Sequence, residues 1–291
     1  MIPASFEYFR PKTLNEAISL LQKHGEDAKI LSGGQSLIPM MKLRLASPPV
    51  IVDINRIEGL NYVNEGDGHL KIGALTREAD LEASEIIRTK YPILADTARV
   101  IGDPLVRNSA TIGGNIAHAD PANDHPATLV ALNASVVVTG PKGRRTIPIH
   151  QFFTGLFMTD MQPDEILTEI RIPVPAGKSG GAYYKVERKV GDFATAAVAA
   201  QITLNASGNI DQVGIALTNV GPTVIHAKEA EDSLRGKNPD APTLAQAAEL
   251  AAKAAQPSSD QRGPAEYKRG LIKTLTVRAL NRAIERAKGG K

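Results

Sequence analysis

The chain has 291 residues and a mass of 31.0 kDa, which is enough for two or three compact domains. Its 34 basic and 31 acidic residues leave a net charge of only +3, and no apolar run approaches the roughly 18 residues that cross a bilayer. We therefore expect no transmembrane segment. The absence of cysteine excludes disulfides, cysteine nucleophiles, thiolate metal sites and iron–sulfur ligation on this chain.

The two ends of the sequence carry little functional signal. The start, "MIPASFEYFRP", lacks the charged beginning and apolar middle of a secretory signal, so we expect a cytoplasmic protein that reaches a membrane only through partners. Much of the basic excess lies in "VRALNRAIERAKGGK", which has no interleaved aromatic residues. We interpret this stretch as the solvated face of a last helix and expect no nucleic-acid partner.

Residues 1–56 predict a small α+β sub-domain. Its helix is the clearest element, because Thr13 and Glu16 have capping-box spacing and Gly25 supplies a stop. The other expected elements are strands at 6–11, 28–31 and 49–54 and a helical stretch at 36–45 that is interrupted at Pro39.

Residues 57–173 predict a second α+β sub-domain. It is expected to contain a hairpin around "NEGDG", helices from Thr76, through "YPILADTARVI" and after "DPANDHP", and strands at "SVVVT" and "EILTEIRIP". The following "PVPAGKSGG", residues 173–181, has the composition of a linker.

Residues 178–291 predict a C-terminal α+β domain with a small antiparallel sheet and helices. Strand-forming residues on both sides of "ASGN" favour a β-hairpin, although the alanines of "FATAAVAAQITLN" alone would favour a helix. Three helices are expected at 226–235, 243–255 and 264–287.

Two glycine turns stand out along the chain, "ILSGGQS" at 30–36 and "TIGGN" at 111–115. Consecutive glycines after a strand let the backbone approach a ligand closely and turn its N–H groups outward, where they can bind phosphate. One such turn would bind one phosphate, and two could hold a diphosphate from both sides. The alternative is that both are purely structural turns.

Other chemistries find less support. Neither turn matches the G-x-G-x-x-G or G-x-x-x-x-G-K-[ST] nucleotide motifs, and no G-x-S-x-G elbow indicates a hydrolase. The cluster His118, Asp120, Asp124 and His125 lacks a regular pair of helical ligand positions, so we expect no metal site. Asp124 could instead accept hydrogen bonds from a cofactor.

With these stretches in hand, the chain resembles the FAD-binding medium subunits of molybdenum hydroxylases, the group of aerobic carbon monoxide and xanthine dehydrogenases. The resemblance spans nearly the whole chain and rests on "LSGGQSLIPMMKLRL", "IGDPLVRNSATIGGNIAHADPANDHPA", "EILTEIRIP", "YYKVERKVGDFATAAVAAQITL" and "SSDQRGPAEYKRGLIKTLTVRAL". It implies an FAD-binding fold of the vanillyl-alcohol-oxidase (PCMH) type in two sub-domains, with the glycine turns closing on the FAD diphosphate.

The resemblance also implies cofactor-binding positions. They are the first turn, Leu31, Ser32, Gly33, Gly34, Gln35, Ser36, Leu37 and Ile38, the second turn, Thr111, Ile112, Gly113, Gly114 and Asn115, and the separate residues Ile101, Asp124, Leu167, Lys185 (or Lys189) and Phe193. Phe193 stands where several relatives carry tyrosine or tryptophan beside the flavin. A phenyl ring can cover a flavin face but cannot donate a hydrogen bond.

By this resemblance, FAD is bound non-covalently, and the chain has no catalytic acid, base or nucleophile. A large molybdopterin subunit and a small subunit with two [2Fe–2S] clusters are implied as partners, in a dimer of heterotrimers, with this chain passing electrons to quinone, NAD or another acceptor. The alternatives are a stand-alone FAD-dependent oxidoreductase and a non-enzymatic nucleotide- or nucleic-acid-binding protein.

Overall fold

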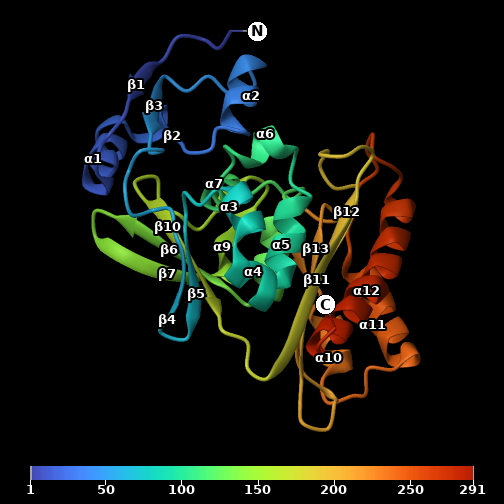
Figure 1. The fold of residues 1–291 in the computed structure, drawn as a ribbon. Helices are drawn as coiled ribbons and strands as arrows, with labels where there is room; N and C mark the ends of the chain where they lie inside the picture. Colours follow the sequence, from blue (N-terminus) through green and yellow to red (C-terminus); the bar gives the residue numbers. More distant parts are fainter. Residues whose placement is uncertain (1, 291) are drawn as a thin grey trace.

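The computed structural model describes residues 2–290. Its three main sheets are built from successive stretches of the chain, residues 7–53, 63–173 and 178–226 (Figure 1). No helix in the described part is long and apolar enough to cross a membrane.

The first sheet is parallel, with the order β1 (Glu7–Phe9), β3 (Val50–Asp53), β2 (Ala28–Leu31). Helix α1 (Leu14–His24) connects β1 to β2 through the short 3-10 helix η1 (Gly25–Asp27), and the predicted cap is confirmed because Thr13 accepts the Glu16 N–H. The predicted interruption at Pro39 is wrong. Pro39 is the third residue of α2 (Leu37–Lys42), in the first turn, where an N–H would have no acceptor within the helix.

The second sheet is antiparallel, with the order β4-β5-β10-β6-β7. Its strands are β4 (Val63–Gly66), β5 (His69–Gly73), β10 (Ile166–Pro173), β6 (Ser135–Gly140) and β7 (Gly143–Pro148). The sequence did not indicate β7, because this edge strand is mostly exposed and carries two arginines.

Short helices and a small hairpin complete this part of the chain. The helices are α3 (Glu78–Ala83), α4 (Glu85–Lys90), α5 (Pro92–Arg99), α6 (Pro104–Arg107), α7 (Ile112–His118), α8 (His125–Ala131) and α9 (Ile149–Phe152), and the hairpin strands are β8 (Phe153–Gly155) and β9 (Met158–Thr159). The sequence did not indicate α4, α6, α9 or the β8–β9 hairpin.

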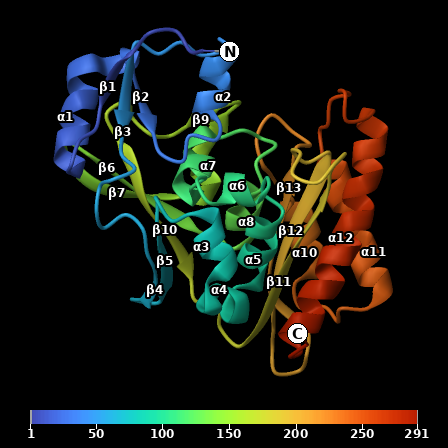
Figure 2. The ribbon, with the colours of Figure 1, turned by 45° about the horizontal axis from the view of Figure 1, so that its top comes forward.

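The third sheet is antiparallel, with the order β11 (Lys178–Val186), β12 (Ala196–Leu204), β13 (Ile210–Thr218), β14 (Ile225–His226). Helices α10 (Lys228–Leu234), α11 (Ala241–Ala254) and α12 (Ala265–Ala287) cover its outer face, and α5 and α8 pack on the inner face (Figures 1 and 2).

This sandwich explains the alanines of β12. Ala197 and Ala199 point into the core shared with the second sheet, while Ala196, Val198 and Ala200 point into the core under α11 and α12. Both faces are buried, so small apolar residues suit both. Strands β12 and β13 pair in antiparallel fashion on either side of "ASGN", so the predicted hairpin is confirmed.

The linker is shorter than predicted, because β11 begins at Lys178 and only residues 174–177 connect the second and third sheets. Gly180 belongs to the strand rather than to the linker. A Cβ added there would lie 2.2 Å from the Ala283 carbonyl oxygen, so glycine lets α12 pack directly on β11.

Candidate functional site

A cavity of about 620 Å³ lies where the three parts of the chain meet, within the usual size range for ligand sites. Helices α2, α6 and α7 and the loop between β11 and β12 reach this same end of the molecule (Figure 2). The predicted site residues that line the cavity are Leu31, Ser32, Gly33, Gly34, Gln35, Ser36, Leu37, Ile101, Thr111, Gly114, Asn115, Asp124, Lys185 and Phe193.

The two glycine turns lie against each other in this cavity. The Ser109 hydroxyl donates to the Gly33 carbonyl oxygen at 2.8 Å, and the hydroxyls of Ser32 and Thr111 are 3.2 Å apart. A Cβ on Gly33 would lie 2.6 Å from the Ser109 carbonyl oxygen, so glycine is required for this close approach. The two turns form one wall rather than two separate surfaces.

The turns differ in what their backbone N–H groups do. Among the described residues, the N–H groups of Gly33, Gly34, Gln35 and Ser36 donate to no protein acceptor. Such consecutive free donors form a cradle for an anion. The conformation depends on glycine again, since Gly34 has φ +78°.

The N–H groups of the second turn already donate hydrogen bonds within the protein. The sequence had suggested that they would point outward to a ligand. Ile112 donates to Thr76 and Gly113 to Ala74, while the Gly114 N–H is bound by the Thr111 hydroxyl that caps α7. This turn therefore offers side chains to the cavity. The Asn115 Oδ1 atom is buried and has no hydrogen-bond partner among the described residues, so it is free to accept one from a ligand.

A buried polar cluster also lines the cavity. Asp124 receives the Tyr183 hydroxyl at 2.6 Å on one oxygen and the Lys185 ammonium at 3.0 Å on the other. Lys185 also donates to the Val100 carbonyl oxygen at 3.0 Å. Burial raises the pKa of Asp124, and the nearby Lys185 opposes that rise. Asp124 thus holds β11 against the α7–α8 connection, in addition to facing the cavity.

Phe193 lies at the cavity mouth with 45% of its surface exposed, in a loop held by charges. Asp192 accepts bonds from Arg188 at 2.9 Å and from Arg262 at 2.8 Å, and these guanidinium groups hold the pKa of its carboxyl well below the usual range. Arg262 also lies 5.8 Å from the Phe193 ring centre. The contacts of Asp192 and Arg262 thus fix the position of Phe193, while part of its side chain stays exposed.

Sequence reasoning missed part of the lining. Phe157, at the tip of the β8–β9 hairpin, lines the cavity and packs on His118 with 5.2 Å between ring centres. It has φ +56°, which no sequence signal reveals. Ser109 does not line the cavity but binds the first turn through Gly33, and it could have been noticed because it stands just before the second glycine turn. Burial lowers the pKa of His118, partly opposed by Asp120.

Four predicted site residues do not line the cavity. Ile112, Gly113 and Leu167 are buried in the protein interior, and Ile38 packs its side chain close to Gly34 from α2. Ile112 and Leu167 belong to the main apolar core. Their cofactor roles stay predictions.

The histidine–aspartate cluster noted in the sequence is dispersed. His125 is fully buried and bonded through Nε2 to Glu78 at 2.7 Å, whereas His118 faces the cavity. Among residues 2–290 no group of three or more histidine or acidic side chains is arranged to hold a metal ion.

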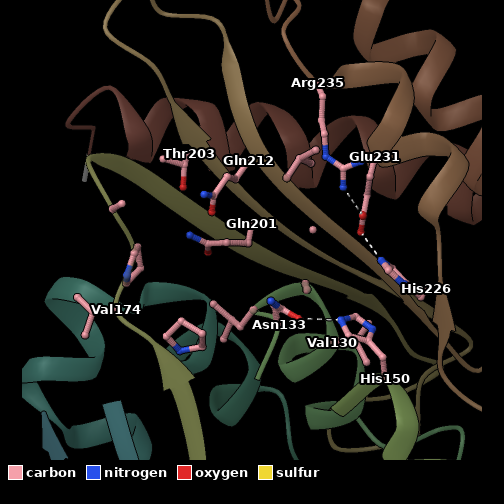
Figure 3. Close-up of a pocket in the computed structure, with 17 residues that line it drawn as sticks. Val130, Asn133, His150, Val174, Gln201, Thr203, Gln212, His226, Glu231 and Arg235 are labelled. Atoms are coloured by element: carbon pink, nitrogen blue, oxygen red, sulfur yellow. Dashed lines mark hydrogen bonds and ion pairs between the residues drawn. The ribbon is translucent and has the colours of Figure 1, made fainter. Parts of the chain in front are cut away.

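A second cavity of about 550 Å³ lies between α8, α9 and the third sheet. Figure 3 shows Gln201, Thr203 and Gln212 on one side, facing Asn133 and Val174 on the other. The charged groups here satisfy one another, because Glu231 accepts bonds from His226 at 2.7 Å and from Arg235 at 3.1 Å. Among the described residues that line this cleft, no run of free backbone donors compares with that of Gly33–Ser36.

Comparison with known proteins identifies the family of this chain. Residues 4–175 match the FAD binding domain in molybdopterin dehydrogenase, and residues 181–283 match the CO dehydrogenase flavoprotein C-terminal domain. The chain is 46% identical to the carbon monoxide dehydrogenase medium chain of Hydrogenophaga pseudoflava, covering 98% of this chain and 99% of that one. It is 40% identical to the glyceraldehyde dehydrogenase medium chain of Sulfolobus acidocaldarius, covering 96% and 99%.

A solved structure of carbon monoxide dehydrogenase from Hydrogenophaga pseudoflava, which lacks the Mo-pyranopterin moiety of the molybdenum cofactor, matches with a TM-score of 0.95 at 46% identity, over 98% of this chain and 99% of that chain. The chain therefore belongs to the family of FAD-binding flavoprotein subunits of the molybdenum hydroxylases. Within this family, the chain is similar to the carbon monoxide dehydrogenase medium chains. The predicted α+β fold of the PCMH type is confirmed. The chain is an oxidoreductase subunit that binds FAD and transfers electrons, which favours neither alternative considered from the sequence.

Proposed function

We propose that the cavity lined by the two glycine turns is the FAD site of this subunit. The free N–H groups of Gly33–Ser36 are the observation that carries the proposal, since four consecutive unpaired donors suit the oxygens of a diphosphate. The buried, unpartnered Asn115 Oδ1 provides an acceptor beside them. These residues fit the cofactor of the family.

The other predicted positions complete this proposal. Asp124 and Lys185 form the polar wall, and Phe193 covers the mouth with an exposed aromatic face. Bound FAD accepts electrons singly and delivers them in pairs, so it connects one-electron centres to a two-electron acceptor. The chain's own residues bind and orient the cofactor and limit access of water to it.

We also propose the division of the chain into residues 1–56, 57–173 and 178–291 and its place in a larger assembly. A small iron–sulfur subunit and a large molybdopterin subunit would join it in a cytoplasmic dimer of heterotrimers. The absence of cysteine supports this arrangement, because the chain has no thiolate ligands for a cluster. Substrate choice would lie on the large subunit, and quinone, NAD or another acceptor would receive the electrons.

The test is to purify the chain with its co-expressed partners, record the visible spectrum, and denature the protein in acid. We expect a yellow protein that releases FAD quantitatively into the supernatant, as identified by chromatography. A colourless complex, or flavin that stays with the precipitated chain, would contradict the proposal. Salt-sensitive binding of DNA or RNA by a flavin-free protein would favour a different function.

A further inference from the structure

Arg77 connects the two glycine turns without lining the cavity itself. Its backbone pairs with the second turn through an antiparallel bridge to Thr111, in which the Glu78 N–H donates to Ala110 and the Ile112 N–H donates to Thr76, both at 3.1 Å. One end of Arg77 is thus attached to the second turn by main-chain bonds.

The Arg77 side chain reaches toward the first turn. Its guanidinium donates to the Ser109 carbonyl oxygen and, at 2.9 Å, to Asn55 Oδ1. The Asn55 amide then donates to the carbonyl oxygen of Ser32, next to Gly33. Ser109 in turn donates to Gly33. The guanidinium therefore links both turns through two short chains of hydrogen bonds.

Asn55 is itself held in place. Asp53, at the end of β3, accepts the Asn55 N–H at 2.9 Å and the Asn55 side-chain amide at 2.7 Å, and its second oxygen accepts the Tyr8 hydroxyl. The acceptor presented to Arg77 is thus fixed by the first sheet. Among the described residues, the two hydrogen bonds of the Arg77 guanidinium go to Ser109 and Asn55 and not to a carboxylate.

We propose that Arg77, acting through Asn55, is a positioning residue that sets the spacing of the two glycine turns and thereby the affinity of the cavity for FAD. The inference rests on the proposed FAD site. Arginine suits this task because its planar fork can hold two acceptors at once, whereas a lysine ammonium has no fixed directions. The spacing matters because free amides bind an anion well only when they are already in place.

The experiment compares R77M, R77K and N55A in the complex with its partners, after removal and titration of FAD. We expect R77M to raise the FAD Kd about 10- to 100-fold, the range expected for losing hydrogen bonds from a charged group. R77K should keep the charge but show most of this loss. R145M is the matched control, since Arg145 also makes several bonds, to Glu165 and Asp160, but lies outside the cavity lining. Its Kd should stay within about 2-fold of the wild-type value.

Two further readouts separate positioning from general destabilisation. The ³¹P resonances of the bound FAD diphosphate should shift in R77M and R77K and not in R145M. The losses in N55A and R77M should be non-additive in the double variant, because both variants remove the hydrogen bond between Arg77 and Asn55. If R77M does not fold, N55A and R77K carry the same test.

The outcomes are distinct. Absence of FAD from the wild-type complex would overturn the proposed function and this inference with it. If FAD binds the wild-type complex, then R77M and R77K with the affinity and ³¹P spectrum of R145M would overturn the inference alone. Full retention of affinity in R77K also overturns it, because long-range charge would then explain the effect without a fork.

Discussion

Ser109 and Gly33 are joined by a hydrogen bond across 76 positions of the chain, and the Ser109 carbonyl oxygen lies where a Cβ of residue 33 would have to go. The contact is both an attraction and a steric limit. It brings the free amides of the first turn against the side chains of the second, which is why one cavity contains both turns.

Gly33→Ala tests this contact. The added Cβ would lie 2.6 Å from the Ser109 carbonyl oxygen and 2.7 Å from Ala110 Cα, and backbone atoms cannot move aside cheaply. We expect at least about a 10-fold weaker FAD affinity, because the turns must separate. Fluorescence titration of the deflavinated complex measures this change.

Gly270→Ala is the matched control for that substitution. An added Cβ on Gly270 in α12 meets nothing within 4 Å. It should leave FAD binding unchanged and stabilise the fold by up to about 1 kcal/mol, since alanine is the better helix former. Unaltered affinity in G33A would refute the close-contact argument.

Lys185→Met removes the cation beside Asp124. The carboxyl would stay buried with only the Tyr183 hydroxyl as donor, so we expect a loss of about 3–5 kcal/mol in unfolding free energy at neutral pH. Urea denaturation measures this loss. Lys189→Met, at an exposed lysine of the loop that follows β11, should change it by less than about 0.5 kcal/mol.

The same variant should show a characteristic pH dependence. Burial already raises the folded-state pKa of Asp124, and loss of Lys185 raises it further. A group with a raised folded pKa contributes stability below its unfolded pKa that is lost as pH rises through the folded value. The deficit of K185M should therefore grow as the pH rises above the ordinary aspartate pKa of 3.8. A deficit that shrinks over this range would show that the pair is not the cause.

His118 gives the opposite dependence. Burial lowers its folded-state pKa from the ordinary value of 6.5, so the folded protein binds fewer protons than the unfolded chain just below that value. Stability should rise with pH up to about 6.5 and level off above it. The variant H118N should flatten part of this slope, and NMR titration should place the imidazole pKa below 6.5. An unchanged slope would exclude His118 as a contributor.

Phe193→Ala removes the aromatic cover at the cavity mouth. We expect FAD to dissociate about 2- to 10-fold faster, in line with the energy of one aromatic contact, while F193Y should keep the wild-type rate. Stopped-flow release of flavin fluorescence measures the rate. Val190→Ala, at a side chain that is 91% exposed in the same loop, is the control. Equal rates in F193A and V190A would place the Phe193 ring outside the site.

Much of this protein could be predicted from local sequence. The capped helix α1, the hairpin of β12 and β13 and the two glycine turns depend on contacts between neighbouring positions, which residue type and spacing reveal. The resemblance to the flavoprotein subunits rests on these turns and on three further stretches of the chain. Edge strand β7 and the β8–β9 hairpin escaped prediction, because they carry no clear period.

Only the tertiary structure decided how the turns are used. It left the amides of Gly33–Ser36 free and satisfied those of Ile112–Gly114 internally, although both stretches read alike as "GG" turns. It also placed Arg77 and Asn55 where they bond to both turns. The physical reason is that a backbone N–H is free or bound according to which distant carbonyl lies opposite it, and such pairings across many positions leave no trace in local composition or spacing.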